Sequence, residues 1–270
     1  MTRDFALHNA VLLGSQALLV GLVGAGVPGW VRARATARWA LVLPLSIAVV
    51  VAGIALLPDV ADVLTWVALL LVPPGAALAL GWAMRGARVA LALLAAPLLA
   101  FAWASQTTAA GELCGLALTA LSCVTLGRLL TGVAPGPWLK AGIVAMAIVD
   151  AILVFSHNLR QPNAVLNAAV PAPGLPQLQY VSFGPANLGY GDLFVAGVLG
   201  GVLAAEGARA WRWALVTWVL AEAWTLLFYV TDTIPATVPV AVALLVRELL
   251  RARRAQPDAV GGEVAHGAHP

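Results

Sequence analysis

The sequence contains little charge. Only 10% of its 270 residues are Asp, Glu, Lys or Arg, and 61% are hydrophobic. A soluble domain carries roughly 25% charged residues, so this chain has too few of them to cover a surface that faces water. The composition excludes a soluble globular enzyme and favours a protein embedded in a lipid bilayer.

Cysteine, histidine and lysine are also scarce. The two cysteines, Cys114 and Cys123, lie in one hydrophobic stretch and indicate neither a disulfide framework nor a zinc site. The four histidines form no HExxH pair, which argues against a zinc intramembrane protease. A net charge of +3 is no footprint for nucleic acid, and Lys140 is the single lysine. An arginine- and alanine-rich chain with one lysine indicates a GC-rich prokaryotic genome, and hence a prokaryotic cell membrane.

The hydrophobic segments are about the length that an α-helix needs to cross a bilayer. Inside lipid the backbone must satisfy its own hydrogen bonds, which permits only helices or closed barrels, and these segments lack the alternation of barrel strands. We therefore predict an all-α polytopic bundle with about nine transmembrane helices. The predicted spans are 6–29, 40–58, 63–83, 87–105, 111–133, 139–157, 188–206, 210–230 and 233–250.

Outside these spans the chain has one long connection and one tail. Residues 158–187 contain five prolines, too many for a helix, and residues 251–270 are polar and glycine-rich, as in a disordered tail. We predict a single transmembrane domain over residues 1–250, with N-terminal spans at 6–133 and a second half at 139–250.

The charges predict an orientation, because positive residues are retained on the cytoplasmic side. With the N-terminus outside, 13 of the 15 basic residues fall on inside segments, and only Arg3 and Arg160 remain outside. The outside loops instead carry the acids Asp4, Asp59, Asp62, Glu112 and Asp232. We therefore expect the N-terminus outside and the C-terminus in the cytoplasm.

Three acids lie within the apolar spans: Asp150, Asp192 and Glu222. An acid inside a bilayer costs several kcal/mol, so each is a candidate functional residue. Asp192 ends the string Leu188-Gly189-Tyr190-Gly191-Asp192, a GxGD motif that enters a hydrophobic helix, and its glycines leave room around the carboxylate. Asp150 lies on the preceding span, and Glu222 is in the middle of the eighth.

This arrangement resembles the presenilin and signal peptide peptidase family of intramembrane aspartyl proteases. Members of that family have nine spans, with one catalytic aspartate in the sixth, the other in a Leu-Gly-x-Gly-Asp motif in the seventh, and a Pro-Ala-Leu motif that opens the ninth. The corresponding segments here are Asp150, Leu188–Asp192 and Pro235-Ala236-Thr237. The resemblance covers residues 139–250, and the N-terminal half agrees only in the number of spans.

Two positions depart from the family pattern. Val149 replaces the tyrosine that usually precedes the first aspartate, and Thr237 replaces the leucine of the third motif. Neither change removes a carboxylate.

The resemblance implies peptide hydrolysis by the Asp150 and Asp192 pair. Two carboxylates in a site of low dielectric do not both ionise, so one activates water while the other protonates the scissile carbonyl, with no metal or organic cofactor. The substrate would be another transmembrane helix, locally unwound, with Leu188, Gly189, Tyr190, Gly191, Pro235, Ala236 and Thr237 as the motif or substrate-binding residues. Residues 177–183 alternate polar and apolar side chains, so they form either a strand that pairs with this substrate or an ordered external loop.

Other readings start from the same residues. Prepilin peptidases also use GxGD, but with a lysine shortly afterwards, where this chain has Leu193-Phe194. A serine rhomboid needs a facing histidine, and Ser15 and Ser122 are typical of small-residue packing. A proton-coupled transporter would use Asp150, Asp192 and Glu222 as a relay, although no inverted repeat is visible. An inactive, protease-like membrane scaffold is the third alternative.

Overall fold

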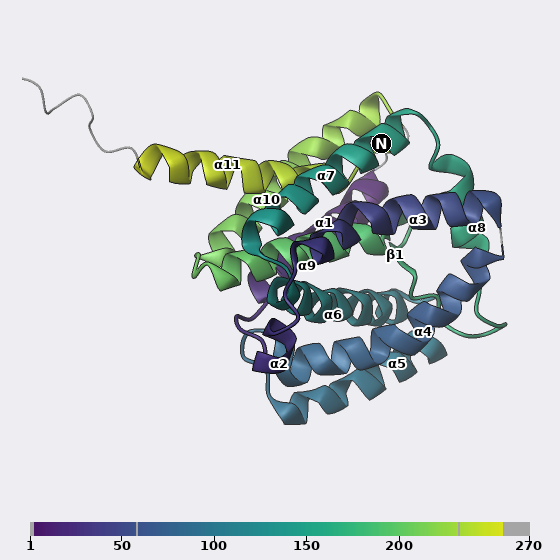
Figure 1. Cartoon of the computed structure of the whole chain (residues 1–270). Helices are drawn as coiled ribbons and strands as arrows, with labels where there is room; N and C mark the ends of the chain where they lie inside the picture. The colour runs from purple at the N-terminus through teal and green to yellow at the C-terminus, as the bar shows by residue number, and fades with distance from the viewer. Residues whose placement is uncertain (1–2, 58, 232, 256–270) are drawn as a thin grey trace, which may run out of the picture.

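The computed structural model describes residues 3–57, 59–231 and 233–255. Within these ranges the chain is mostly helical, with a single short β-hairpin (Figure 1). The eleven α-helices of the described residues are α1 (Arg3–Leu22), α2 (Gly29–Arg32), α3 (Val42–Leu56), α4 (Val60–Leu78), α5 (Ala95–Ala104), α6 (Ala109–Val133), α7 (Gly136–Phe155), α8 (Arg160–Ala168), α9 (Tyr190–Ala205), α10 (Ala210–Trp224) and α11 (Val238–Ala255). Tighter or wider helical turns, η1 (Ala37–Leu41), η2 (Ala79–Ala83), η3 (Val89–Leu94) and η4 (Thr225–Tyr229), extend or connect them.

Five of these helical segments are long and apolar enough to cross a membrane. They are Asp4–Leu22, Ala37–Leu56, Val60–Ala83, Ala109–Val133 and Gly136–Phe155. Many of their large apolar side chains, such as Leu70 and Ile148, are exposed on the outside of the bundle. A lipid-facing surface of this kind indicates an integral membrane protein.

The prediction of nine full-length spans is wrong for the other four segments. Residues 89–104 and 190–205 form apolar helices that are shorter than the five, and α10 gives way to the tighter turn η4 after Trp224. The ninth segment begins at Val238 rather than near residue 233, and its last turn is basic. Pro235 and Pro239 supply no N–H to a helix, which explains why α11 starts late.

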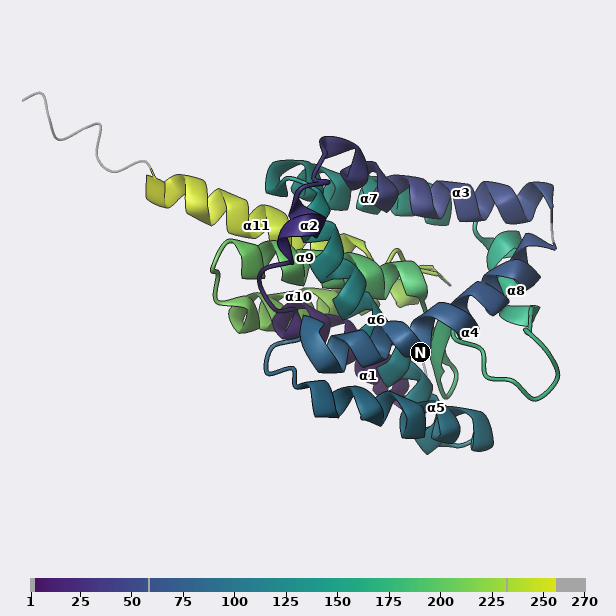
Figure 2. The ribbon, with the colours of Figure 1, turned by 60° about the horizontal axis from the view of Figure 1, so that its bottom comes forward.

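Helix α9 is at the centre of the molecule, packed against α6, α1 and α7 (Figures 1 and 2). Every residue from Leu193 to Ala204 is buried. A helix that is apolar on all sides belongs in a core, so α9 is held by protein rather than by lipid.

The contact between α6 and α9 depends on glycines. A Cβ at Gly197 of α9 would lie 2.5 Å from the backbone oxygen of Cys123, and one at Gly201 would lie 2.7 Å from the backbone oxygen of Gly127. Side chains at these positions would push the helices apart. Small residues let the two backbones approach closely, as they do between helices in membranes.

Two predictions for the connecting segments need correction. Helix α8 occupies residues 160–168 of the connection that was predicted to be non-helical. Its Pro162 lies in the first turn, where backbone N–H groups have no partner within the helix, so proline is tolerated there. Residues 251–255, predicted to begin the disordered tail, continue α11, and the rest of that tail lies outside the described residues.

The chain enters α9 through an antiparallel hairpin. Strand β1 (Tyr180–Phe183) pairs with β2 (Ala186–Gly189) in the register that places Tyr180 opposite Gly189. The alternating pattern of residues 177–183 therefore forms a strand in its second half. The first residues of the predicted seventh span, Leu188 and Gly189, belong to β2 instead of a helix.

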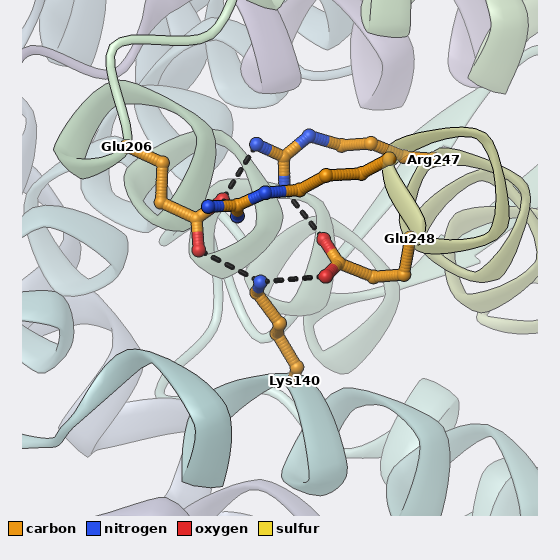
Figure 3. A network of polar contacts seen from close by, with 5 residues as sticks. Lys140, Glu206, Arg247 and Glu248 are labelled. Carbon is orange, nitrogen blue, oxygen red and sulfur yellow. Dashed lines mark hydrogen bonds and ion pairs between the residues drawn. The ribbon is translucent and has the colours of Figure 1, made fainter. Parts of the chain in front are cut away.

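An ion-pair network joins the start of α7, the residue after α9 and the middle of α11 (Figure 3). Lys140 Nζ lies 2.7 Å from Glu206 Oε1 and 2.9 Å from Glu248 Oε2. Arg247 Nη2 contacts Glu206 Oε2 at 2.5 Å, and its Nη1 contacts Glu248 Oε1 at 2.7 Å. The same three helical segments carry the candidate acids and Thr237 away from this network, so the network fixes another part of the assembly.

Candidate functional site

Asp150 lies on the buried face of α7. Only 6% of its surface is exposed, and Ile143, Met146, Ala147 and Val154 are buried on the same face. These positions recur every three or four residues, so the helix presents the carboxyl to the interior of the bundle rather than to lipid.

Asp192 lies in the first turn of α9, directly after β2. Its Oδ2 accepts a hydrogen bond of 3.1 Å from the backbone N–H of Gly189, the residue before the helix begins. An acid at this position satisfies a free N–H and faces the positive end of the helix dipole. The GxGD motif is thus a helix start built around the aspartate.

The structure brings these two acids together. Helices α7 and α9 pack against each other, and a Cβ on Gly191 would lie 3.2 Å from Met146, one turn before Asp150. The Asp192 carboxyl is within electrostatic range of the Asp150 carboxyl. Two helices that are separated in the sequence by the long connection and the hairpin therefore contribute one acid each to a single site.

The Pro235-Ala236-Thr237 segment also reaches this site. The Thr237 hydroxyl donates a hydrogen bond of 2.6 Å to Asp150 Oδ2, and Thr237 is almost fully buried. Leucine at this position could not make such a bond. The departure from the family pattern thus supplies a polar partner for one of the two carboxyls.

Leu188, Tyr190, Pro235 and Ala236, the other motif residues, are buried or partly buried. Leu188 is buried and pairs with Val181 of β1, and the Tyr190 hydroxyl lies 3.0 Å from the Ser122 hydroxyl of α6. Pro235 is buried, and Ala236 is partly buried.

Glu222 lies apart from the pair. Its carboxyl bonds to Trp218 in its own helix, and its Oε1 is buried with no hydrogen-bond partner among the described residues. Within the part of the chain that the structure describes, neither aspartate carboxyl interacts with Glu222.

The candidate serines have local partners. The Ser15 hydroxyl donates to the backbone oxygen of Leu12, and that of Ser122 donates to the backbone oxygen of Thr119. Both bonds stay within one helix, and the Ser122 hydroxyl also lies 3.0 Å from the Tyr190 hydroxyl of α9.

One residue of this site was not predicted from the sequence. Gln16 of α1 is completely buried, and its side-chain amide donates to the backbone oxygens of Asp192 and Ala236, each at 3.0 Å. The available signal was a lone amide within an apolar span. The partners of that amide are about 180 and 220 residues away in the sequence, so only the fold reveals them.

Chemically, the site is a pair of carboxyls with a hydroxyl beside one of them. Such a pair can hold one proton between two acids and pass it to a bound group. Comparison with known proteins adds no assignment, because no family model, no curated protein and no solved structure matches the chain.

Proposed function

We propose that the chain is an intramembrane aspartyl endopeptidase, which hydrolyses peptide bonds within transmembrane helices or signal-peptide remnants. The observation that carries this proposal is that the Asp150 and Asp192 carboxyls, from two different helices, lie within electrostatic range of each other in an apolar bundle. The resemblance of the three motifs to presenilins and signal peptide peptidases supports it. Charged groups are too costly in a membrane interior to be paired there without a use.

Each aspartate has a role in the reaction. The ionised carboxylate takes a proton from a water molecule, whose oxygen attacks the carbon of the scissile carbonyl. The protonated carboxyl gives its proton to the carbonyl oxygen. When the carbon–nitrogen bond breaks, the leaving amine takes up a proton and the dyad again holds one, so peptide and water become an acid and an amine.

Thr237 and Gly189 hold these carboxyls in place. A hydrogen bond from the Thr237 hydroxyl fixes Asp150 Oδ2, and the Gly189 N–H fixes Asp192 Oδ2. The Thr237 backbone also bonds to the Asp150 carboxyl. Groups fixed before the substrate arrives cost little reorganisation during the reaction.

The hairpin is a suitable place for an unwound substrate. A cavity of about 240 Å³ lies along residues 176–182 and the start of α6, and its lining includes Gln177, Tyr180, Ser182 and Glu112. An extended segment there could pair with the chain that leads into α9, as strand addition does in other proteins. A helix must open locally before its peptide bonds can be attacked, and pairing with a strand stabilises the open form.

We further propose that the shorter apolar segments 89–104 and 190–205 also cross the membrane, with the N-terminus outside. Each spans about 24 Å at 1.5 Å per residue, which a locally thinned bilayer accommodates. In this orientation both aspartates lie nearer the outer side. By resemblance to signal peptide peptidases, favoured substrates have their N-terminus in the cytoplasm.

Cleavage of labelled transmembrane peptides by the purified chain in liposomes tests the function. The panel should contain peptides inserted in both orientations, and the control is the chain with both Asp150→Ala and Asp192→Ala. Products from the native chain alone support an aspartyl protease. If the native chain cleaves no peptide of either orientation, the protease proposal fails. The transporter and scaffold alternatives are then favoured.

A further inference from the structure

Gln16 connects two segments of the site that are distant in the sequence. It belongs to α1, which packs against α9 and α10, and it contributes no group that the proposed hydrolysis uses. Its Nε2 donates to Asp192 O in the first turn of α9 and to Ala236 O in the turn before α11. One side chain thus holds the backbone that carries Asp192 and the backbone next to Thr237.

The direction of this amide is determined by its neighbours. Both nearby backbone atoms are carbonyl oxygens, which accept hydrogen bonds only, so the nitrogen rather than the oxygen of the side chain must face them. The two N–H groups of an amide diverge at a fixed angle. They can satisfy both acceptors only when the two segments keep one relative position.

The consequences extend to the two carboxyls. Ala236 is bonded covalently to Thr237, whose hydroxyl holds Asp150. Gln16 is therefore linked to Asp192 on one side and, through Ala236 and Thr237, to Asp150 on the other. A shift of either segment changes the separation of the carboxyls, and misplacement by about 1 Å can cost a reaction roughly 100-fold in rate.

From these contacts we infer that Gln16 is a positioning residue, which sets the spacing of the Asp150 and Asp192 carboxyls through their backbone supports. This inference rests on the proposed function where it concerns the rate of cleavage. Where it concerns the geometry of the two carboxyls, it stands independently of any substrate.

The test compares Gln16→Leu with a matched variant, Asn9→Leu. Leucine has nearly the volume of glutamine and no donors, so it removes the bonds without opening a cavity. Asn9 is a second buried amide of α1, two turns away, and it makes no bond to Asp192 or to residues 235–237 within the described chain. Both substitutions replace a buried amide with an apolar group, so a general effect of that loss appears in both.

The first readout needs no activity. In protein with ¹³C-labelled aspartate carboxyls, signals assigned through Asp150→Asn and Asp192→Asn are followed as the pH is varied. We expect Gln16→Leu to shift the pH midpoint at which each of the two signals changes. Asn9→Leu should leave both midpoints as in the native chain. Identical titrations in native and Gln16→Leu protein overturn the inference, whether or not the chain cleaves peptides.

The second readout is peptide cleavage. We expect kcat of Gln16→Leu to fall 10- to 100-fold with KM changed less than threefold, and Gln16→Asn, which keeps both donors on a shorter side chain, to recover part of the rate. A rise in KM alone, or an equal loss in Asn9→Leu, contradicts a positioning role. If the native chain is inactive, the proposed function fails and the titration alone decides the role of Gln16.

Discussion

At the scale of single residues, the site contains more polar contacts than its motifs suggest. Asp150 is fixed by Thr237, Asp192 by Gly189, and the backbones behind them by Gln16. Gly189 is a local partner, three residues before Asp192, whereas Thr237 and Gln16 come from distant parts of the chain. The pair of acids is therefore held by the tertiary structure together with the local GxGD turn.

Thr237→Val tests the contribution of the hydroxyl. Valine has the same shape but cannot donate to Asp150 Oδ2, so the carboxyl loses one of its restraints. We expect kcat for peptide cleavage to fall about 10-fold, with a displaced pH–rate profile, because a hydrogen bond to a charged group contributes roughly 1.5–3 kcal/mol.

Thr217→Val is the control for this substitution. Thr217 is equally buried, but its hydroxyl bonds to Trp213 O within α10, away from the aspartates. A native pH profile in Thr237→Val, or the same displacement in Thr217→Val, would show that the hydroxyl does not act on Asp150.

The acids themselves were predictable from the sequence, because a carboxyl in an apolar span is conspicuous. Their partners were not. Thr237 was recognised as a departure from a motif, but a hydroxyl 87 residues from Asp150 gives no sign of its bond until α7 and α11 are placed. Gln16 carried no motif at all.

At the scale of elements, the close approach of α6 and α9 positions Asp192. We expect Gly197→Ala to lower the stability of the protein in detergent by about 1–3 kcal/mol, because its Cβ would meet the Cys123 backbone. The measurement is the midpoint of thermal unfolding.

Gly14→Ala is the matched control, since nothing lies within 4 Å of a Cβ at that position of α1. Alanine is the better helix former, so this variant should be at least as stable as the native chain. Equal midpoints for the two variants would mean that α6 and α9 are not in backbone contact.

The ion-pair network makes the stability of the fold depend on pH. Burial raises the pKa of Glu206, but hydrogen bonds from Lys140 and Arg247 outweigh it and hold this pKa below its ordinary value of 4.5. The carboxylate therefore stabilises the fold above that value, and the contribution disappears as the pH falls through the lowered pKa. We expect Glu206→Gln to be less stable than the native chain at pH 7, and the difference to shrink as the pH falls below 4.5 and through the lowered pKa of Glu206.

Arg251→Gln tests whether the exposed contact at the edge of the network contributes to stability. Arg251 also reaches Glu206, at 3.3 Å, but its side chain is 62% exposed, and exposed ion pairs contribute little. Its unfolding midpoint should match the native one at every pH. A loss as large as that of Glu206→Gln would place the stabilising contact at the exposed rim instead.

The position of most helices follows from runs of apolar residues, which is why each predicted span contains helix. The exact ends do not follow from composition. Leu188 and Gly189 read as the start of a span, yet they pair with β1, because the hairpin satisfies their backbone groups before α9 begins. Pro162 read as a helix breaker, although the first turn of α8 tolerates it.

At the scale of the whole molecule, Arg128 joins α6 to the segments that follow α1 and α4. Arg128 of α6 donates to Gly26 O at 2.6 Å and to Ala25 O at 2.9 Å, just beyond α1, and its guanidinium stacks on Trp82. The segments after α1 and η2 meet at the Val23–Met84 bridge. Charge bias predicts that this side faces the cytoplasm.

The orientation is tested with single cysteines. They are introduced one at a time into a cysteine-free chain that carries Cys114→Ala and Cys123→Ala. We expect Pro173→Cys, in the long connection, to react with a membrane-impermeant maleimide on intact cells, and Ala35→Cys to react only after permeabilisation. Both positions are exposed. The reverse pattern would place the dyad nearer the cytoplasm and invert the expected substrate orientation.

The most direct measurement is the cleavage rate of one transmembrane peptide by the native chain, by Asp150→Asn, by Asp192→Asn and by the double variant. Asparagine keeps the shape of the side chain and removes the acid. If the two carboxyls act as a unit, each single variant loses as much as the double variant, at least 1,000-fold, because residues that share one step are not additive. Cleavage that survives either single substitution would contradict the dyad.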